Sequence, residues 1–219
     1  MLKKLLSTIH EPVYRKRIAV LSDLIVAHLQ PGDKVLDVGC GSGMLGGRIQ
    51  THPKLPADVT VRGLEKVPRG GEPIDVVQYA SGDFPFDDDA FDVVILADVL
   101  HHEEQEEALL REAARVCRRT LVIKDHKPEG LLAYQRICFL DWAANNPHGV
   151  RCLYRYHSQR EWHQMFEKLG LSPAEELTSI ALYPPVFNFV FGKRLQYFVA
   201  LRTSGVKHAV GNPESILPV

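Results

Sequence analysis

Val35–Gly43 reads V-L-D-V-G-C-G-S-G, and the rest of the chain is organised around this stretch. Its first half lies in Lys34–Val38, a short apolar run with the composition of a buried strand. Three glycines then occupy alternate positions, at Gly39, Gly41 and Gly43. A strand that turns sharply into a helix leaves backbone N–H groups facing a ligand, and only residues without side chains let that ligand approach closely. The stretch therefore predicts a strand, a tight turn and a helix that together surround a ligand.

The composition is that of a soluble globular protein. The chain has 219 residues, of which 45% are hydrophobic and 24% are charged, and its formal net charge is −1. This balance does not favour a nucleic acid or an anionic membrane as a partner, and no apolar run approaches the roughly 20 residues that span a bilayer. The four cysteines form no C-x-x-C pair and show no metal-ligand spacing. We therefore expect a cytoplasmic protein with reduced thiols, no nucleic-acid partner and no integral membrane segment.

The hydrophobic pattern predicts strands and helices that largely alternate. Strands are expected at Lys34–Val38, Asp58–Leu64, Ile74–Tyr79, Phe91–Ala97, Leu121–Lys124, Leu177–Leu182 and Leu195–Leu201. Helices are expected at Tyr14–Leu29, Met44–Thr51, Glu103–Arg118, Leu131–Ala144 and Ser158–Gly170. The prolines and glycines of residues 66–73 predict a loop between the second and third strands instead of a helix. The expected fold class is α/β, with a Rossmann-like, doubly wound, mostly parallel sheet and an antiparallel C-terminal edge hairpin.

Two acidic residues accompany the glycine turn. Glu65 follows the predicted second strand, where a carboxylate can accept hydrogen bonds from both hydroxyls of a ribose. Such bonds to a charged acceptor contribute about 1.5–3 kcal/mol each when they form away from water. Asp37 lies inside an apolar strand, where a carboxylate is costly unless backbone N–H groups or a cation pair with it. The combination favours a nucleoside ligand over an ordinary surface role for Glu65.

Two later stretches, together with V-L-D-V-G-C-G-S-G, resemble the class I S-adenosylmethionine (SAM) dependent methyltransferases, close to their type 11 group. Phe84–His102, read F-P-F-D-D-D-A-F-D-V-V-I-L-A-D-V-L-H-H, resembles the third and fourth motifs of that family. Leu110–His126, read L-R-E-A-A-R-V-C-R-R-T-L-V-I-K-D-H, resembles the helix and fifth strand that follow. The similarity covers roughly residues 31–126, and it implies SAM as the cofactor and methyl transfer as the reaction.

The resemblance also implies which residues hold the cofactor. By position these are Asp37, Gly39, Cys40, Gly41, Gly43, Glu65, Lys66, Gly82, Asp83, Ala97 and Asp98. Glu65 would hold the ribose, and Asp37 would orient the glycine turn and meet the ammonium of the methionine moiety. Family members usually place an aspartate against the adenine at the end of the third strand, where this chain has Ala80. The adenine contact therefore passes to Asp83 or to a backbone amide of Gly82 or Asp83.

Three histidines are candidate catalytic bases. His101, His102 and His126 follow the fourth and fifth predicted strands, at the carboxyl edge where ligands bind to such sheets. Histidine is a suitable base near neutral pH, and a base is needed only if the acceptor must lose a proton. The alternative for each is a structural role. We expect no metal site, because adjacent residues at the start of a helix should diverge.

The domain organisation is expected to separate the two substrates. We expect one domain over residues 1–203, with a helical cap over residues 1–30 and a helical acceptor-site insertion over residues 127–170. Residues 204–219 are expected to form a loose tail. The first helix either packs on the core through its apolar stripe or covers the cofactor through residues that include Tyr14, Arg15 and Arg17.

The sequence leaves alternatives open for the residues that would bind the acceptor. Asp141–Val150, Tyr154, Tyr156 and Trp162 either line an acceptor pocket or pack in the core. Tyr183–Gly192, which is strongly apolar, forms either a buried connection or an exposed lip suited to a hydrophobic or carrier-bound acceptor. The predicted function is methyl transfer to oxygen or carbon of a small or medium-sized organic molecule.

Two other functions remain open at this point. One is an NAD(P)-dependent oxidoreductase, although the glycines run G-x-G-x-G instead of G-x-G-x-x-G. The other is a relative that binds SAM without catalysing transfer. An intact glycine turn is compatible with both.

Overall fold

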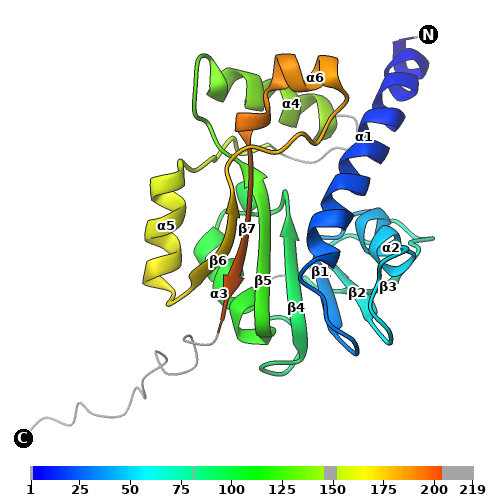
Figure 1. The fold of residues 1–219 in the computed structure, drawn as a ribbon, viewed down its shortest axis with the longest axis vertical. Helices are drawn as coiled ribbons and strands as arrows, with labels where there is room; N and C mark the ends of the chain where they lie inside the picture. Colours follow the sequence, from blue (N-terminus) through cyan, green and yellow to red (C-terminus); the bar gives the residue numbers. More distant parts are fainter. Residues whose placement is uncertain (1, 81, 146–151, 204–219) are drawn as a thin grey trace, which may run out of the picture.

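A seven-stranded mixed sheet forms the centre of the computed structural model, which describes residues 2–80, 82–145 and 152–203 (Figure 1). The strands are β1 (Lys34–Val38), β2 (Thr60–Glu65), β3 (Asp75–Gln78), β4 (Phe91–Ala97), β5 (Cys117–His126), β6 (Ser172–Leu177) and β7 (Gln196–Arg202). Their order is β3-β2-β1-β4-β5-β7-β6. The first five strands pair in parallel, and β7 pairs antiparallel with both β5 and β6. The predicted Rossmann-like sheet with antiparallel strands at its C-terminal edge is confirmed.

Helices cover both faces of the sheet and one of its ends. They are α1 (Leu2–Val26), α2 (Met44–Gln50), α3 (Glu106–Val116), α4 (Ala133–Asn145), α5 (Gln159–Lys168) and α6 (Pro185–Phe191), with 3₁₀ turns η1 (Leu100–His102) and η3 (Lys193–Leu195). One hydrophobic core joins α3 and α5 to the sheet, and a second joins α1 and α2 to it. Helices α4 and α6 lie beyond the carboxyl ends of the parallel strands (Figure 1). The sheet edge at which ligands bind in such folds therefore faces α4 and α6.

Burial on both faces explains the composition of the central strands. Val93, Val94 and Ile95 of β4 are fully buried, and so are Leu121 and the two residues after it in β5. A strand covered by helices on both sides needs apolar side chains in both directions, so it reads as a continuous apolar run. The F-D-V-V-I-L-A stretch is therefore recognisable from sequence alone.

The start of α5 agrees with the helix predicted at Ser158–Gly170. Ser158 caps the helix: its hydroxyl accepts from the Glu161 N–H, and the Glu161 carboxylate accepts from the Ser158 N–H at 2.8 Å. Trp162, one residue further on, is 1% exposed and stacks on Phe166 and Tyr197. Trp162 therefore packs in the core, and the alternative in which it lines an acceptor pocket is wrong. Helix α5 covers the sheet, so the helical material at the sheet edge before β6 is α4.

Several predicted boundaries differ from the structure. The first helix begins at Leu2 instead of Tyr14 and contains Pro12, and β5 begins at Cys117, directly after α3. The predicted strand Leu177–Leu182 is wrong, because β6 ends at Leu177. Its sequence, S-P-A-E-E-L, lies at the sheet edge and is largely exposed, so it lacks the apolar residues that identify buried strands. Pairing with β7 is what makes it a strand.

Two further predictions concern loops and termini. Residues 66–74, all of which the structure describes, contain no helix between β2 and β3, as expected. The stretch Tyr183–Gly192 contains α6, where Phe189 is 90% exposed, which agrees with an exposed lip. The expected tail at residues 204–219, and residues 146–151 of the predicted acceptor stretch, lie outside the described residues. Among the described helices, none is both long enough and apolar enough to cross a membrane.

Candidate functional site

The glycine turn after β1 is held in a backbone conformation that requires glycine. Gly39, Gly41 and Gly43 have φ angles of 63°, 57° and 69°, all in the left-handed region. The Gly39 N–H donates to the Leu64 carbonyl at 2.7 Å, which ties the turn to the end of β2. A Cβ atom at Gly39 would lie 2.8 Å from Cγ2 of Val99, closer than carbon atoms pack. The turn therefore depends on glycine for both its conformation and its space.

Glu65 holds the glycine turn from the end of β2. Its Oε2 accepts from the Gly41 N–H at 2.7 Å, and its Oε1 accepts from the N–H groups of Lys66 at 2.8 Å and Val67 at 3.2 Å. These three donors fix the carboxylate beside the turn, at the position that the sequence predicts for a ribose acceptor. Each oxygen has more than one acceptor position, so this carboxylate can also bind a diol.

Asp37 lies under the turn and is 2% exposed. Burial raises the pKa of this carboxyl to about 7, although the backbone N–H of Gly46 and the more distant Arg17 oppose the shift. Its Oδ2 atom has no hydrogen-bond partner among the described residues. An unpartnered buried carboxylate oxygen is costly, and a cationic group bound above the turn would pair with it. The unpartnered Oδ2 of Asp37 therefore indicates that the residues present can bind a ligand with an ammonium group.

The other predicted cofactor residues fall into two groups. Cys40 packs against the backbone of β2, where a Cβ on Gly63 would approach its sulfur to 2.6 Å, and burial raises the pKa of its thiol to about 12. Lys66 extends from the end of β2 and pairs with Glu103 at 2.5 Å. Gly82 and Asp83 are both exposed beyond the end of β3. The structure thus places Cys40 and Lys66 near the turn. It leaves Gly82 and Asp83, the two candidate adenine contacts, at the outer end of the sheet.

Asp98 directly follows Ala97, the last residue of β4, and has a strained backbone. Its φ angle is 57°, uncommon for a residue other than glycine. Its carboxylate forms ion pairs with Arg17 of α1 and Lys124 of β5. Burial alone would raise the pKa of Asp98, but Lys124 and Arg17 outweigh burial and hold the pKa well below its usual range. Strain and buried ion pairs of this kind concentrate at functional sites.

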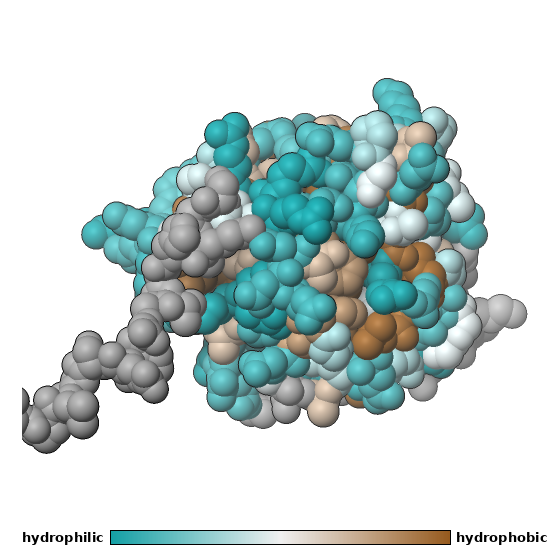
Figure 2. All heavy atoms as spheres, turned by 90° about the horizontal axis from the view of Figure 1, so that it is seen from below, coloured by the Kyte–Doolittle hydropathy of each residue, from teal (hydrophilic) through white to brown (hydrophobic). Residues whose placement is uncertain are grey.

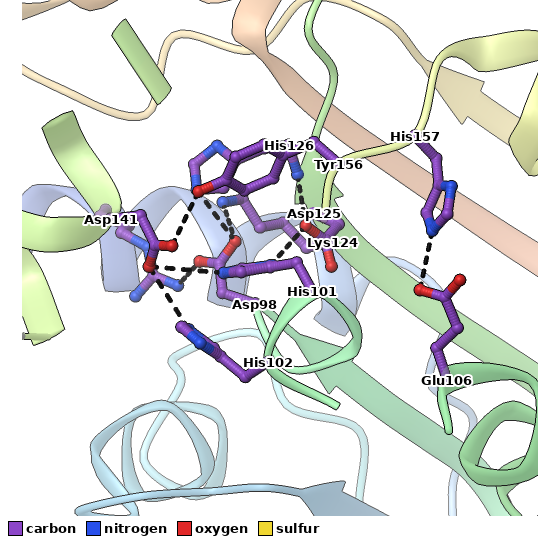
Figure 3. Close-up of polar contacts among 11 residues, drawn as sticks. Asp98, His101, His102, Glu106, Lys124, Asp125, His126, Asp141, Tyr156 and His157 are labelled. Carbon is purple, nitrogen blue, oxygen red and sulfur yellow. Dashed lines mark hydrogen bonds and ion pairs between the residues drawn. The ribbon is translucent and has the colours of Figure 1, made fainter. Parts of the chain in front are cut away.

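The three predicted catalytic histidines lie together at the ends of β4 and β5 (Figure 3). His101 of η1 contacts the Asp125 carboxylate through Nδ1 at 2.7 Å, and the same Asp125 oxygen accepts from the His126 N–H at 2.7 Å. The ring centroids of His101 and His102 are 4.1 Å apart, and those of His101 and His126 are 5.4 Å apart. We refer to His101, His102, His126, Asp125, Asp141 and Tyr156 as the histidine cluster.

Asp141 of α4 contacts three other members of the histidine cluster. Its Oδ1 lies 3.7 Å from Nε2 of His101 and 3.5 Å from Nε2 of His102, and its Oδ2 accepts from the Tyr156 hydroxyl at 2.7 Å. The adjacent histidines therefore converge on one carboxylate. The expectation that they diverge is wrong, because they lie on a 3₁₀ turn whose geometry differs from that of an α-helix start.

The three histidines are not equivalent as bases. Burial lowers the pKa of His101, but the carboxylates of Asp125 and Asp141 outweigh burial and raise the pKa to about 10. Burial and the Lys124 ammonium together lower the pKa of His126 to about 3. At neutral pH the His101 ring is therefore charged and the His126 ring is neutral. Sequence alone treats the three as equivalent, because these shifts arise from neighbours on other elements.

Lys124 and Asp125 were not singled out as site residues from sequence, whereas Asp141 and Tyr156 were named as residues that either line an acceptor pocket or pack in the core. Lys124, Asp125, Asp141 and Tyr156 complete the ion pairs and hydrogen bonds around the predicted histidines. The first two carry a signal, since K-D-H places three polar residues at the end of an apolar strand. Asp141 and Tyr156 come from segments whose position is set by tertiary packing.

Comparison with known proteins agrees with this geometry. The family model described as a methyltransferase domain matches residues 10–176, which is more than half of the chain. The chain therefore belongs to the methyltransferase domain family, and its identification as a class I SAM-dependent methyltransferase is confirmed. SAM is its cofactor. Membership of this family also decides against the NAD(P)-dependent oxidoreductase alternative.

Individual relatives are more distant. The 27-O-demethylrifamycin SV methyltransferase of Amycolatopsis mediterranei is 35% identical over 41% of this chain, and the match spans only 36% of that relative. A SAM-dependent methyltransferase of Thermotoga maritima, described as a possible histamine N-methyltransferase, has a TM-score of 0.64 at 14% identity, with 92% and 94% of the two chains covered. Magnesium protoporphyrin IX methyltransferase of Synechocystis, solved with bound S-adenosylhomocysteine (SAH), has a TM-score of 0.55 at 18% identity, with 87% and 83% covered. These two structures show that the fold is shared.

Proposed function

We propose that this chain transfers the methyl group of SAM to oxygen or carbon of a small or medium-sized organic acceptor. The observation that carries the proposal is the position of η1 between two sites. Val99, just before η1, packs against Gly39 of the glycine turn, and His101 and His102 of η1 reach Asp125 and Asp141. A ligand on the turn and a ligand at the histidine cluster would therefore meet at the end of β4.

The glycine turn takes the cofactor in this proposal. Glu65 holds the ribose hydroxyls, Asp37 pairs with the ammonium through its unpartnered oxygen, and the turn lets the ligand approach the backbone. Gly82 or Asp83 supplies the adenine contact. When bound, SAM supplies the electrophilic methyl carbon. The chain supplies alignment, which alone contributes about 7–11 kcal/mol of barrier lowering in well-oriented systems.

The histidine cluster takes the acceptor. His102 faces Asp141 and its side chain is 16% exposed, so it would contact the acceptor atom. His101 and His126 are buried and would position Asp141 and Asp98, respectively. An oxygen acceptor suits this polar set, since a hydroxyl must lose a proton in the reaction. The name of the Amycolatopsis relative describes methylation at oxygen, which supports the same choice.

The surface above the cluster favours an apolar acceptor. Large exposed apolar side chains gather on and beside α4 and α6: Leu131, Leu132, Tyr134, Phe139, Trp142, Val186 and Phe189. Leu131 is 86% exposed and Phe189 is 90% exposed. The opposite end of the molecule is mostly hydrophilic and also carries an apolar area (Figure 2). Apolar surface concentrated beside a polar site suits the entry of a hydrophobic or carrier-bound molecule.

Cofactor binding tests the first half of the proposal. Calorimetric titration with SAM and SAH should show binding, and either ligand at about 100 times its Kd should stabilise the chain by roughly 2.7 kcal/mol. NADH should give no stabilisation. Glu65→Ala should weaken SAM binding at least tenfold, because it removes hydrogen bonds to a charged acceptor. Glu167→Ala, an exposed change on α5, is the matched control and should leave the affinity unchanged. Equal affinities for the two variants would contradict the assignment of Glu65 as the residue that binds the ribose.

Turnover tests the second half. The chain is incubated with methyl-labelled SAM and a panel of phenols, hydroxy acids, amines, thiols and activated carbon acids, both apolar and polar. We expect label transfer to apolar hydroxyl or carbon acceptors, with SAH formed in equal amount. Tight SAM binding without transfer to any class would instead identify a non-catalytic relative. Transfer confined to amines would contradict the proposed acceptor atom.

A further inference from the structure

We propose that His101, His102 and Asp141 form a binding site for a divalent transition-metal ion of zinc-like ligand preference. The candidate ligand atoms are Nε2 of each histidine and Oδ1 of the aspartate, and the ion would displace the proton that Nε2 of His101 carries in its absence. One ligand atom from each residue lies within 4.8 Å of the other two. The two histidine–aspartate separations are 3.7 and 3.5 Å, and Figure 3 shows both rings directed at the same carboxylate.

These separations suit an ion better than direct hydrogen bonds. Hydrogen bonds between nitrogen and oxygen span about 2.7–3.2 Å, so neither histidine is at an ideal distance from Asp141. An ion bound at about 2.0–2.2 Å holds neighbouring ligand atoms roughly 3.0–3.6 Å apart. The two histidine–aspartate separations, 3.7 and 3.5 Å, therefore lie within or just beyond the range that such an ion imposes.

The surrounding residues hold the ligand atoms in place. Asp125 contacts Nδ1 of His101 at 2.7 Å, so the ring turns its Nε2 toward Asp141. The Tyr156 hydroxyl donates to Oδ2 of Asp141 at 2.7 Å, so Oδ1 is the oxygen that faces the histidines. Carboxylate-supported histidines and hydrogen-bonded carboxylates are the usual support of metal ligands. This arrangement is independent of the ligand spacing and points to two of the same three atoms, Nε2 of His101 and Oδ1 of Asp141.

A second possible triad in the described residues is less suitable. Asp98, His101 and Asp125 also bring ligand atoms within 4.8 Å of one another. However, Asp98 already pairs with the cations of Arg17 and Lys124, which would repel a metal ion. The Nδ1 atom of His101 is likewise already in contact with Asp125. The geometry therefore points to Asp141 as the carboxylate ligand.

The ligand set indicates both the ion and its use. Two imidazoles and one carboxylate suit Zn²⁺, Fe²⁺, Co²⁺ or Mn²⁺ better than Ca²⁺ or Mg²⁺. Three protein ligands leave a coordination position for another molecule. Its use rests on the proposed function: the ion would bind the acceptor hydroxyl oxygen and favour release of its proton to water. The oxygen–methyl bond then forms as the carbon–sulfur bond of SAM breaks, leaving SAH.

Metal titration of the full chain tests the site without any turnover. The chain is treated with a chelator under reducing conditions, freed of chelator, and titrated with Co²⁺ while its visible absorption is followed. Equilibrium dialysis against Zn²⁺ gives the stoichiometry. We expect one ion per chain and at least a tenfold loss of affinity in both His102→Ala and Asp141→Asn. Tyr156→Phe should weaken binding about 10–100-fold, because it removes a support of the ligand and not the ligand itself.

The matched control is His157→Ala. His157 lies outside the histidine cluster and pairs with Glu106 at 2.8 Å (Figure 3), so its replacement should leave the metal affinity unchanged. Circular dichroism and SAM binding are measured for every variant. Absence of stoichiometric metal on the wild type, or unchanged affinity in His102→Ala, overturns the metal site. Loss of the ion only in His157→Ala also overturns it. Metal binding without SAM binding overturns the proposed function and leaves the metal site standing.

Discussion

The glycine turn and the histidine cluster lie at the same edge of the sheet, but they are built differently. The turn uses backbone N–H groups and one carboxylate, Glu65, which lies on the next strand in the sequence. The cluster uses side chains from η1, β5, α4 and the segment before α5, and its neighbour Asp98 pairs with Arg17, 81 positions away. A site made of backbone shows in the sequence as glycine spacing, whereas a site made of distant side chains leaves scattered polar residues.

The comparison predicts that substitutions beside the histidine cluster lower the free energy of unfolding more than substitutions in the glycine turn. Asp98→Ala should destabilise the chain by about 3–5 kcal/mol, because it leaves the buried Lys124 and the half-buried Arg17 without their shared carboxylate. Asp88→Ala is the control: Asp88 is 77% exposed and pairs with Arg115, so its loss should cost less than about 1 kcal/mol. Urea denaturation of both variants gives the two values. Equal losses would mean that the ion pairs around Asp98 contribute no more than a surface pair.

Asp37, under the glycine turn, should contribute to the pH dependence of stability. The pKa of Asp37 is raised from 3.8 to about 7, so the folded chain keeps a proton that the unfolded chain releases. The contribution of Asp37 to stability should therefore fall as pH rises from about 4 to about 7 and then level off. Three pKa units correspond to about 4 kcal/mol. The free energy of unfolding of Asp37→Asn relative to wild type should rise by that order between pH 4 and pH 8. A difference that does not change with pH would show that Asp37 is ionised in the fold.

A smaller loss of stability should distinguish the cost of a left-handed backbone from the cost of a steric clash in the glycine turn. Gly39→Ala forces both a left-handed alanine and a contact with Val99 at 2.8 Å. Gly71→Ala imposes a similar φ of 77°, but nothing lies within 4 Å of the new Cβ. Gly39→Ala should therefore be less stable than Gly71→Ala by about 1–3 kcal/mol, the usual cost of overpacking. Thermal unfolding of both variants measures the difference. If the two variants were equally stable, the backbone conformation alone would account for glycine at position 39.

The smallest expected effect on stability comes from a change in α6, within the exposed apolar stretch Tyr183–Gly192. Phe189→Ser on α6 changes a side chain that is 90% exposed, so stability should move by no more than about 0.5 kcal/mol. Val67→Ser, 74% exposed in the loop after β2, is the control for removing an exposed apolar side chain elsewhere. Partition of each variant onto a hydrophobic matrix, or KM for an apolar acceptor once one is found, should change for Phe189→Ser only. A matching change in Val67→Ser would remove the distinction between the two surfaces.

Prediction from sequence succeeded where contacts are local or where burial leaves a pattern. The strand limits of β1 and β4, the glycine turn, the helix start at Ser158 and the position of Glu65 all follow from residues near one another in the chain. Prediction failed at β6, because an exposed edge strand carries no apolar alternation. It also failed for the direction of His101 and His102, which depends on a 3₁₀ turn and on α4.

The sequence by itself determined the methyltransferase class, the cofactor and the strand that carries each half of the site. The class and the cofactor come from the resemblance of Val35–Gly43, Phe84–His102 and Leu110–His126 to a known family. The strands come from apolar runs, which burial imposes within short segments. Only the tertiary structure decided that Asp141 and Tyr156 meet the two histidines, and that His101 and His126 shift their pKa in opposite directions. Both outcomes depend on charges and hydrogen bonds between elements far apart in the chain, and short-range spacing does not encode such distances.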